Sequence, residues 1–364
     1  MFNLIKWFQL KFPNIVNEMK NSNHHYDEKN LNPYHLEGDV WTHTLMVYNY
    51  AYNLDSKNNN LLLAALLHDV GKPTSRMVKE DTLKVRFFNH ENISTYYAID
   101  ILLELKKDEP SFEFDLLQVL LLINWHSDFH SLEIKNGIFS NDVISFINKK
   151  YSNLELYMNM ISLNEADNYG RITEIENEQG AKEKFEILKS ITPFDNSYIN
   201  ENNPIAIILV GIPATGKSTY IKKISNENNK EFIILSTDDI IQEKYPDLEY
   251  NQAFERIQSK GIFNEIENEF FNRLKNAVKD RKNIIVDQTN LTKKSRRKKL
   301  NIIPTKYYVK KGVVFLRGKQ QQQEFANKRK LETNKFINHM VINNMVSNFI
   351  VPGLDEFDLI EYII

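Results

Sequence analysis

The sequence predicts two domains, a mostly helical one followed by an α/β domain with a parallel sheet. Its 364 residues are about twice the length of a usual folding unit. Apolar residues recur at helical spacing in the first half, whereas short β-branched runs alternate with helical stretches in the second. With 42% hydrophobic and 26% charged residues, the composition excludes wholesale disorder. We predict domains at residues 1–190 and 205–364, joined by a linker at residues 191–204.

The periodicity places the individual elements. Helices are predicted in three segments of the first half: Trp41–Asp69, Ile99–Lys107 and Leu116–His130. The linker contains Pro193 and polar residues without periodicity. Buried parallel strands are predicted at four places in the second half: Ile205–Val210, Phe232–Leu235, Ile284–Val286 and Val313–Leu316.

The composition also limits the class of protein. The chain has no Cys, so disulfides and thiolate metal sites are excluded. No window reaches the length of about 18 apolar residues that a membrane helix needs, and the apolar start carries Lys6 and Lys11. We therefore expect a cytoplasmic protein.

Charge and histidine are unevenly divided between the halves. Residues 1–200 hold 19 Lys and Arg against 28 Asp and Glu, whereas residues 201–364 hold 27 against 20. Eight of the nine His precede residue 131. An acidic, His-rich half suggests a metal site and a basic half suggests a polyanion binder, although an ordinary solvated surface would fit the charge equally well.

A phosphate-binding loop follows the first predicted strand of the second half. Its glycines permit the turn that directs backbone N–H groups inward, Lys217 neutralises the outer phosphates, and the Ser218 hydroxyl holds Mg²⁺. The sequence thus predicts a site for ATP or another NTP. The residues expected to bind it are Gly211, Ile212, Pro213, Ala214, Thr215, Gly216, Lys217, Ser218 and Thr219.

Polar residues end two of the predicted strands. Asp238 follows the strand that ends at Leu235, and Asp287 with Asn290 follows Val286. Both carboxylates emerge at the edge where doubly wound sheets bind ligands, so we expect Asp238 to act as the base in phosphoryl transfer to a hydroxyl. We expect Asp287 and Asn290 to contact the substrate. The alternative is that Asp238 and Asp239 form an N-cap pair.

Two basic segments follow in the second half. A helix carrying Arg329 is predicted to close over the phosphates as a lid, although a solvated basic helix fits almost as well. The run Lys293–Lys299 holds six cations in seven residues. We favour contacts with nucleic-acid phosphates for this run over a solubility role.

The second half resembles the 5′-OH polynucleotide kinase domain of phage and bacterial end-healing enzymes. The resemblance spans Ile205 to the C-terminus and is carried by the phosphate loop, the Asp238 doublet, the Asp287–Leu291 segment, the basic lid and the closing Phe349–Asp358 segment. It implies transfer of the NTP γ-phosphate to a 5′-hydroxyl of RNA or DNA. Two departures stand out: Ile241 occupies a position where relatives carry Arg, and either Arg329 or Lys330 can be the lid cation.

The histidines of the first half form a set suited to two divalent metals. His43, His68, Asp69 and Asp167 are expected to hold one ion; Asp69, His90 and His126 the other. Such a pair activates a water for phosphoester hydrolysis, and Lys72 and Arg171 add positive charge for the phosphate. The two ions are expected to be divalent transition metals, such as manganese, nickel, cobalt, iron or zinc.

Each His also has a simpler interpretation, because a single His on an apolar helix is more often a satisfied core residue than a ligand. His126 is preferred to His130 as a ligand because it directly follows the apolar stretch ending at Trp125. His35 is expected near the metals or the phosphate, and His24 and His25 in a loop.

Residues 33–172 resemble the HD-superfamily metal phosphohydrolases, nearest to the HD domain of bacterial CCA-adding enzymes. The resemblance is carried by His35–Val47, His68–Pro73 and Phe88–Glu91. It implies an all-α fold and action on nucleotide-type phosphoesters, including 2′,3′-cyclic phosphates and 2′ or 3′ monophosphates. With the second half, it makes the chain similar to bacterial bifunctional HD and 5′-OH polynucleotide kinase enzymes.

Together these observations predict a nucleic-acid end-healing enzyme. The first half clears 2′,3′-cyclic, 2′ or 3′ phosphates, the second phosphorylates the 5′-OH, and a separate ligase could seal the ends. Two rivals remain: an enzyme of the nucleotide pool that acts on free nucleosides and nucleotides, and a nucleotide-gated regulatory protein with one inactive domain.

Overall fold

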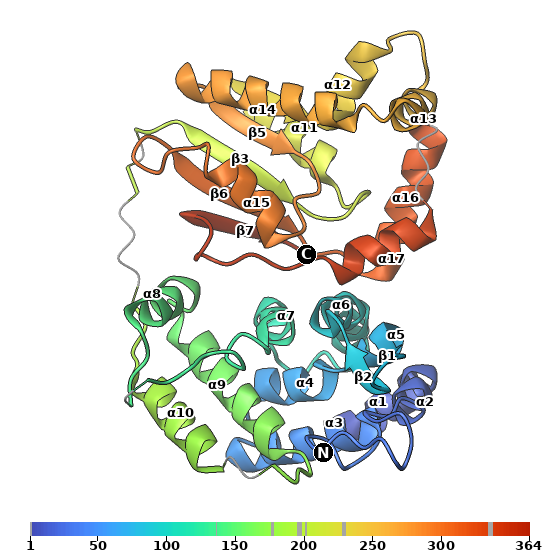
Figure 1. Ribbon diagram of the computed structural model, residues 1–364, viewed down its shortest axis with the longest axis vertical. Helices are drawn as coiled ribbons and strands as arrows, with labels where there is room; N and C mark the ends of the chain where they lie inside the picture. The colour runs from blue at the N-terminus through green and yellow to red at the C-terminus, as the bar shows by residue number, and fades with distance from the viewer. Residues whose placement is uncertain are drawn as a thin grey trace. The chain divides into compact units, whose positions relative to one another are not determined.

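The computed structural model describes residues 2–135, 137–175, 178–194, 199–200, 202–227, 231–333 and 338–364 (Figure 1). The chain divides into two compact units, Met1–Asp195 and Asn196–Ile364. Within the predicted linker, residues 195–198 and 201 lie outside the described residues. No helix in the described part of the chain combines the length and hydropathy needed to span a membrane.

The first unit is mainly helical. Its elements are α1 Leu4–Lys11, α2 Pro13–Lys20, α3 Val40–Leu54, α4 Asn59–Leu67, α5 Lys72–Ser75, β1 Arg76–Lys79, β2 Lys84–Phe87, α6 His90–Asp108, α7 Leu116–Trp125, α8 Asn141–Lys150, α9 Leu154–Tyr169 and α10 Glu178–Ser190. Helix α4 is central, because every residue of Leu61–Leu67 is buried and its neighbours are α3, α7 and α9.

Two helix boundaries in this unit and one hairpin differ from the sequence prediction. The predicted helix Trp41–Asp69 is two helices, because α3 ends at Leu54 and Asn58 caps a new helix by accepting a hydrogen bond from the Leu61 N–H. Helix α7 ends at Trp125, so His126 and His130 do not share a helix. The antiparallel hairpin of β1 and β2 was not predicted.

The second unit is an α/β domain. Its elements are β3 Ile205–Val210, α11 Lys217–Glu227, β4 Phe232–Ser236, α12 Thr237–Lys244, α13 Tyr250–Lys260, α14 Phe263–Lys279, β5 Asn283–Asp287, α15 Lys293–Leu300, β6 Val309–Phe315, α16 Lys319–Thr333, α17 His339–Ser347 and β7 Leu359–Ile363.

The strands form a parallel five-stranded sheet in the order β4-β5-β3-β6-β7 (Figure 1). Ile207, Leu209 and Phe315 on one face pack against Ile221 of α11. The four predicted strands are present, and β7 is an additional edge strand. In the β4–β5 register Ser236 lies opposite Asp287, so the polar residues that follow both strands meet at the carboxyl edge of the sheet.

Candidate active sites

Helices α3 and α9 bring the first two predicted metal ligands together. His43 lies on α3, and its Nε2 is 3.0 Å from Oδ1 of Asp167 on α9. The other ring nitrogen, Nδ1, lies 2.9 Å from Oε1 of Glu37, whose side chain is fully buried. The sequence analysis did not single out Glu37, although it lies within the His35–Val47 segment on which the HD resemblance rests.

The turn after α4 supplies the next group. His68 Nε2 lies 3.2 Å from Asp69 Oδ2 and 3.8 Å from Asp167 Oδ1, while Lys72 Nζ lies 2.6 Å from Asp69 Oδ2. Gly71 lets this turn approach α6, because a Cβ at position 71 would lie 2.5 Å from the His90 carbonyl oxygen. The Gly71 N–H also donates to Ser94 Oγ on α6.

His90 and His126 complete the cluster from the start of α6 and the end of α7. Their Nε2 atoms are 3.2 Å apart, and His90 Nε2 lies 3.2 Å from Asp69 Oδ1. The Nδ1 atoms of His90 and His126 lie 2.9 and 2.7 Å from the carbonyl oxygens of Phe87 and Ile123. These backbone contacts orient both rings so that Nε2 faces the carboxylate of Asp69.

The cluster fits two metal ions in its donor chemistry. His43, His68 and Asp167 form one group and Asp69, His90 and His126 another, with the potential ligand atoms of each group within 4.8 Å of one another. Nε2 of His68 and Oδ1 of Asp69 are buried without a hydrogen bond that meets the geometric criteria, whereas Oδ2 of Asp69 is in an ion pair with Lys72. Imidazole and carboxylate donors of this kind suit divalent transition metals.

Charge states in the cluster also favour cation binding. Burial, together with the neighbouring His90 and His68, lowers the pKa of His126 to about 3, so its ring is neutral. Burial opposes ionisation of Asp69, but His68 and Lys72 hold its pKa well below the usual range. Burial also disfavours a charged His43, yet its contacts with Asp167 and Glu37 raise its pKa to about 9. A metal at His43 must therefore displace a proton.

The remaining predicted residues of this half lie around the cluster. His130 is half-exposed, with Nε2 3.4 Å from Asp167 Oδ2. Arg171 donates to Asn168 Oδ1, and no contact with Asp167 is found in the described structure. His24 lies in the loop between α2 and α3, as expected, but it is buried: its ring stacks on His35 at 4.3 Å, and its Nε2 lies 3.3 Å from Lys72 Nζ.

The phosphate loop connects β3 to α11. Gly216 adopts a φ of +99°, which favours glycine, and the Gly211 N–H donates to the Thr289 carbonyl oxygen after β5. Lys217 Nζ donates to the carbonyl oxygens of Gly211 and Ile212 at 2.9 and 2.7 Å. Burial and, to a smaller extent, Arg329 lower the pKa of Lys217 to about 8, against the opposing effect of Asp287 and Asp238.

The acceptor-side residues lie at the ends of β4 and β5. Tyr250 of α13 donates a 2.7 Å hydrogen bond to Asp238 Oδ1, a contact that the sequence did not reveal. Burial raises the pKa of Asp287, with Asp238 and Asp239 adding to the effect of burial while Lys217 opposes it. The predicted N-cap pair is wrong, because Ser236 caps α12 and both Asp residues lie in its first turn.

Asn290 and Ile241 are both buried in the P-loop domain. Asn290 is 2% exposed, adopts a left-handed φ of 48°, and donates to the Leu209 carbonyl oxygen. It thus ties the segment after β5 to β3, and the structure does not place its side chain at an open surface. Ile241 is 3% exposed, so α12 presents no cation at that position.

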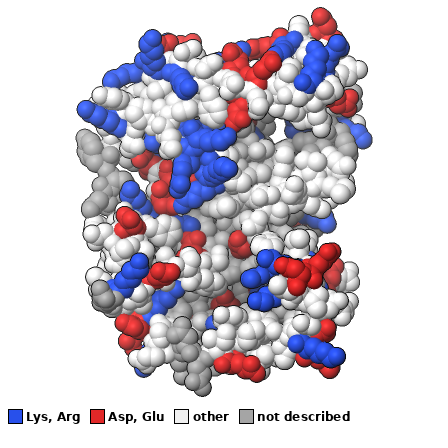
Figure 2. All heavy atoms as spheres, viewed as in Figure 1, with Lys and Arg blue, Asp and Glu red and all other residues white. Residues whose placement is uncertain are grey.

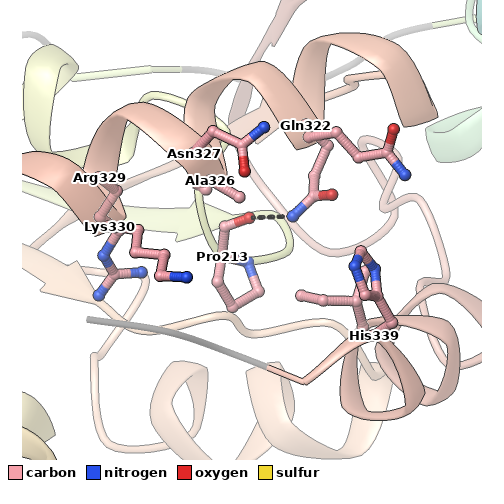
Figure 3. A pocket seen from close by; sticks show the side chains of 10 residues that line it. Pro213, Gln322, Ala326, Asn327, Arg329, Lys330 and His339 are labelled. Atoms are coloured by element: carbon pink, nitrogen blue, oxygen red, sulfur yellow. Dashed lines mark hydrogen bonds between the residues drawn. The ribbon is translucent and has the colours of Figure 1, made fainter. Parts of the chain in front are cut away.

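A cavity of about 300 Å³ lies between the phosphate loop and the helices α16 and α17. Figure 3 shows Arg329 and Lys330 on one side of Pro213 and His339 on the other. Gln322 donates to the Pro213 carbonyl oxygen and connects α16 to the loop. Of the two candidate lid cations, Arg329 is half-buried and influences the pKa values of Lys217 and Asp287, whereas Lys330 is exposed.

The basic run Lys293–Lys299 forms α15, over which Lys and Arg side chains gather on the face shown in Figure 2. Arg296 is fully buried and makes two hydrogen bonds to Glu356, with three more to the carbonyl oxygens of Asn290, Leu291 and Ile350. Lys293 pairs with Asp355. Because a helix can turn at most about half of these cations toward one ligand, a nucleic-acid contact can involve only part of the run, and Arg296 and Lys293 belong to the part that holds the domain together.

Two family models match the chain. Residues 40–167 match the HD domain and residues 207–352 match the AAA domain. The curated protein L-seryl-tRNA(Sec) kinase of Methanococcus maripaludis is 33% identical over 153 residues, 40% of this chain and 53% of that protein. The chain thus spans about half the length of this curated relative.

Solved structures with a similar fold include a chain of the Pnkp1/Rnl/Hen1 RNA repair complex. It is 24% identical, covers 43% of this chain and 46% of that chain, and has a TM-score of 0.33. A gluconokinase from Sinorhizobium meliloti 1021 is 15% identical over 43% of this chain and 87% of that chain, with a TM-score of 0.28. Likenesses at these scores do not identify a function.

The family matches and the sheet confirm the fold class predicted from the sequence. They also confirm the domain combination predicted from the sequence, an HD domain followed by a P-loop domain with a parallel sheet. The chain therefore joins an HD domain at residues 40–167 to an AAA-type P-loop domain at residues 207–352 in one polypeptide.

Proposed function

We propose that the chain is a bifunctional enzyme that repairs nucleic-acid ends. Its HD domain hydrolyses 2′,3′-cyclic, 2′ or 3′ phosphate ends, and its P-loop domain transfers the γ-phosphate of ATP or another NTP to a 5′-OH end. The observation that supports the proposal is the occurrence in one chain of two different groupings: paired His and Asp groups that could hold metals in one unit, and a phosphate loop near carboxylates at strand ends in the other.

In the HD domain, the proposed roles follow from the contacts within the cluster. Divalent ions held by the two groups would supply Lewis acidity and a water of lowered pKa. Asp69 lies between the groups, because its Oδ2 is 3.2 Å from His68 Nε2 and its Oδ1 is 3.2 Å from His90 Nε2. Lys72 is placed beside Asp69 to neutralise charge on the substrate phosphate.

In the P-loop domain, Lys217 and Arg329 are proposed to meet the migrating phosphoryl group and Asp238 to accept the proton of the attacking hydroxyl. Tyr250 orients Asp238 through its hydrogen bond. Binding of the nucleotide must draw Lys217 Nζ away from the Gly211 and Ile212 carbonyl oxygens, with Ser218 at the start of α11 holding Mg²⁺.

The curated relative favours a hydroxyl on RNA as the acceptor, since its name makes it a kinase of L-seryl-tRNA. A second candidate function follows from the same likeness: transfer to the seryl hydroxyl of an aminoacyl-tRNA. Because both candidates use the same P-loop residues, only the acceptor distinguishes them.

One experiment tests both halves. An oligonucleotide with a 5′-OH and a 2′,3′-cyclic phosphate is incubated with labelled NTP, Mg²⁺ and Mn²⁺ or Ni²⁺, and both ends are analysed, with a nucleoside and seryl-tRNA as alternative acceptors. We expect label at the 5′ end and loss of the cyclic phosphate. Lys217→Ala abolishes only the first change and His68→Ala only the second. Transfer to the nucleoside or seryl-tRNA but not to the oligonucleotide contradicts the proposal.

A further inference from the structure

A second cavity, of about 190 Å³, lies between α14 and α15. Two aromatic residues of α14, Phe270 and Phe271, line it. Helix α15 contributes Lys294, Lys298 and Lys299. Three ammonium groups around one cavity, with apolar rings beside them, are the composition of a site for a phosphate attached to a sugar or base.

Lys299 is the central observation. The residue is 6% exposed, and its Nζ donates to the Ser295 carbonyl oxygen at 3.3 Å and lies 5.9 Å from the centre of the Phe270 ring. It forms no ion pair with a carboxylate in the described structure. Burial lowers its pKa to about 8. Glu267 favours the charged form of Lys299 only from a distance, and because an ammonium group without a direct ion pair is costly to bury, an anionic ligand in the cavity would offset that cost.

The other lysines lining the cavity do not have the buried, fully hydrogen-bonded contacts within the domain that Arg296 has. Lys298 pairs with Glu267, but both side chains are about half-exposed, at 52% and 50%, so the pair is weakly held. Lys294 is exposed and has no ion pair within the described residues. The cavity thus keeps a surplus of positive charge after its one carboxylate, Glu267, is counted.

The position of the cavity connects it to the acceptor carboxylates. Gln288, which lines it, directly follows Asp287 at the end of β5. Asp287 in turn lies opposite Ser236, two residues before Asp238. One wall of the cavity, Gln288, therefore lies at the carboxyl edge of the sheet where the proposed base is found, whereas the larger cavity is lined by the phosphate loop, α16 and α17.

We propose that the cavity between α14 and α15 binds the first phosphodiester of the acceptor strand, the one on the 3′ side of the nucleoside that carries the 5′-OH. The inference rests on the proposed kinase function and adds to it a reason why a strand is preferred to a free nucleoside. Lys299 and Lys294 contact the phosphate oxygens, and Phe271 offers an apolar surface to the adjacent sugar or base.

The test compares two acceptors, a nucleoside and a dinucleoside monophosphate, by transfer of labelled phosphate. The dinucleoside carries an internal phosphodiester, which the proposed HD activity on terminal phosphates does not remove. We expect the wild-type chain to prefer the dinucleoside, and Lys299→Met to reduce kcat/KM for the dinucleoside about tenfold, as the loss of one ammonium–phosphate contact implies. The KM for NTP and the rate with the nucleoside should not change.

Matched controls separate this role from a structural one. Arg297→Ala removes an exposed cation of the same helix that does not line the cavity, and it should leave the acceptor preference intact. Lys299→Met keeps the side-chain volume, and thermal melting checks its fold. Lys294→Ala, at an exposed position, should reduce the preference without affecting the fold.

The outcomes are distinct for the two proposals. If Lys299→Met and Lys294→Ala both keep the wild-type preference, the phosphate site is wrong although the kinase function stands. If the wild-type chain phosphorylates neither a dinucleoside nor an oligonucleotide at a 5′-OH, the proposed function itself fails, and the site fails with it.

Discussion

The two candidate sites differ in how their polar atoms are satisfied. In the HD domain, buried atoms of His68 and Asp69 face one another outside hydrogen-bond geometry. In the P-loop domain, Lys217 already donates to two carbonyl oxygens of its own loop. The first site therefore combines converging donor atoms with contacts such as His43–Asp167 and Lys72–Asp69, whereas in the second site Lys217 must exchange its hydrogen bonds within the loop for contacts with a nucleotide.

This difference affects how much of the binding free energy each site must use to rearrange its own side chains. A metal at His90 and His126 would meet rings already oriented by backbone contacts, whereas a metal at His43 must displace the proton that the ring shares with Asp167. A nucleotide must move Lys217 and engage α16, so part of its binding energy goes into rearrangement.

The largest effect is expected from Asp69→Asn. The change removes the carboxylate charge that lies between His68, His90 and Lys72, so phosphoester hydrolysis should fall by at least about a hundredfold while kinase activity stays at the wild-type level. Release of phosphate and label transfer measured on the same preparation check this. Equal loss of both activities would show that the two sites are not independent.

A large loss of stability is expected from Arg296→Met. Arg296 is fully buried with Glu356, so removing it leaves an uncompensated carboxylate and costs about 3–5 kcal/mol of unfolding free energy. Denaturant unfolding of the P-loop domain measures it, with the exposed Arg297→Ala as the control. If Arg296→Met weakened nucleic-acid binding and left the stability unchanged, Arg296 would be a ligand contact after all.

A smaller effect is expected from Glu37→Gln. Glu37 lies against His43 Nδ1 and so orients a proposed metal ligand without joining the set itself. Metal affinity should fall about 10- to 100-fold. A metal titration of the chelator-treated chain measures it, and excess metal should restore most of the hydrolysis. If Glu37→Gln left the metal affinity unchanged, Glu37 would not position His43 for metal binding.

The smallest effect is expected from Tyr250→Phe, which deletes the hydroxyl that donates to Asp238 Oδ1. Loss of one hydrogen bond of this kind should reduce the kcat of the kinase about 2- to 10-fold, with the KM for NTP unchanged. Steady-state kinetics with varied acceptor and varied NTP separate these constants. A change confined to the KM for NTP would place Tyr250 on the donor side instead.

The sequence predicted the features that depend on local pattern. The strand Ile205–Val210 and the loop that follows it are recognisable because their residue types and spacing carry the structure directly. Strand β7 escaped detection because a short edge strand after a motif-rich segment has little periodicity of its own. The burial of His24 within its predicted loop was not foreseen, because its neighbours in sequence are polar while its burial comes from contacts with His35 and Lys72.

The basic run Lys293–Lys299 shows that the number of charges in a segment does not reveal which of them are available to a ligand. At most half of these six cations can face one ligand, because they are spread round a helix, but charge composition does not say which of the side chains find a partner inside the fold. Arg296 found Glu356, 60 residues away, and Lys299 was buried over Phe270. The structure is needed to separate the cations that stabilise α15 from those that remain for a ligand.

The hydrogen bonds of Arg296 predict where substitutions that inactivate the P-loop domain will be found. One guanidinium joins the turn after β5 to the chain between α17 and β7, through the carbonyl oxygens of Leu291 and Ile350 and the carboxylate of Glu356. A screen for inactive alleles should therefore recover substitutions in Ile350–Glu356 that disturb the Asp287 turn from a distance. Suppressors of such alleles should map to the turn itself, even though the two segments are far apart in the gene.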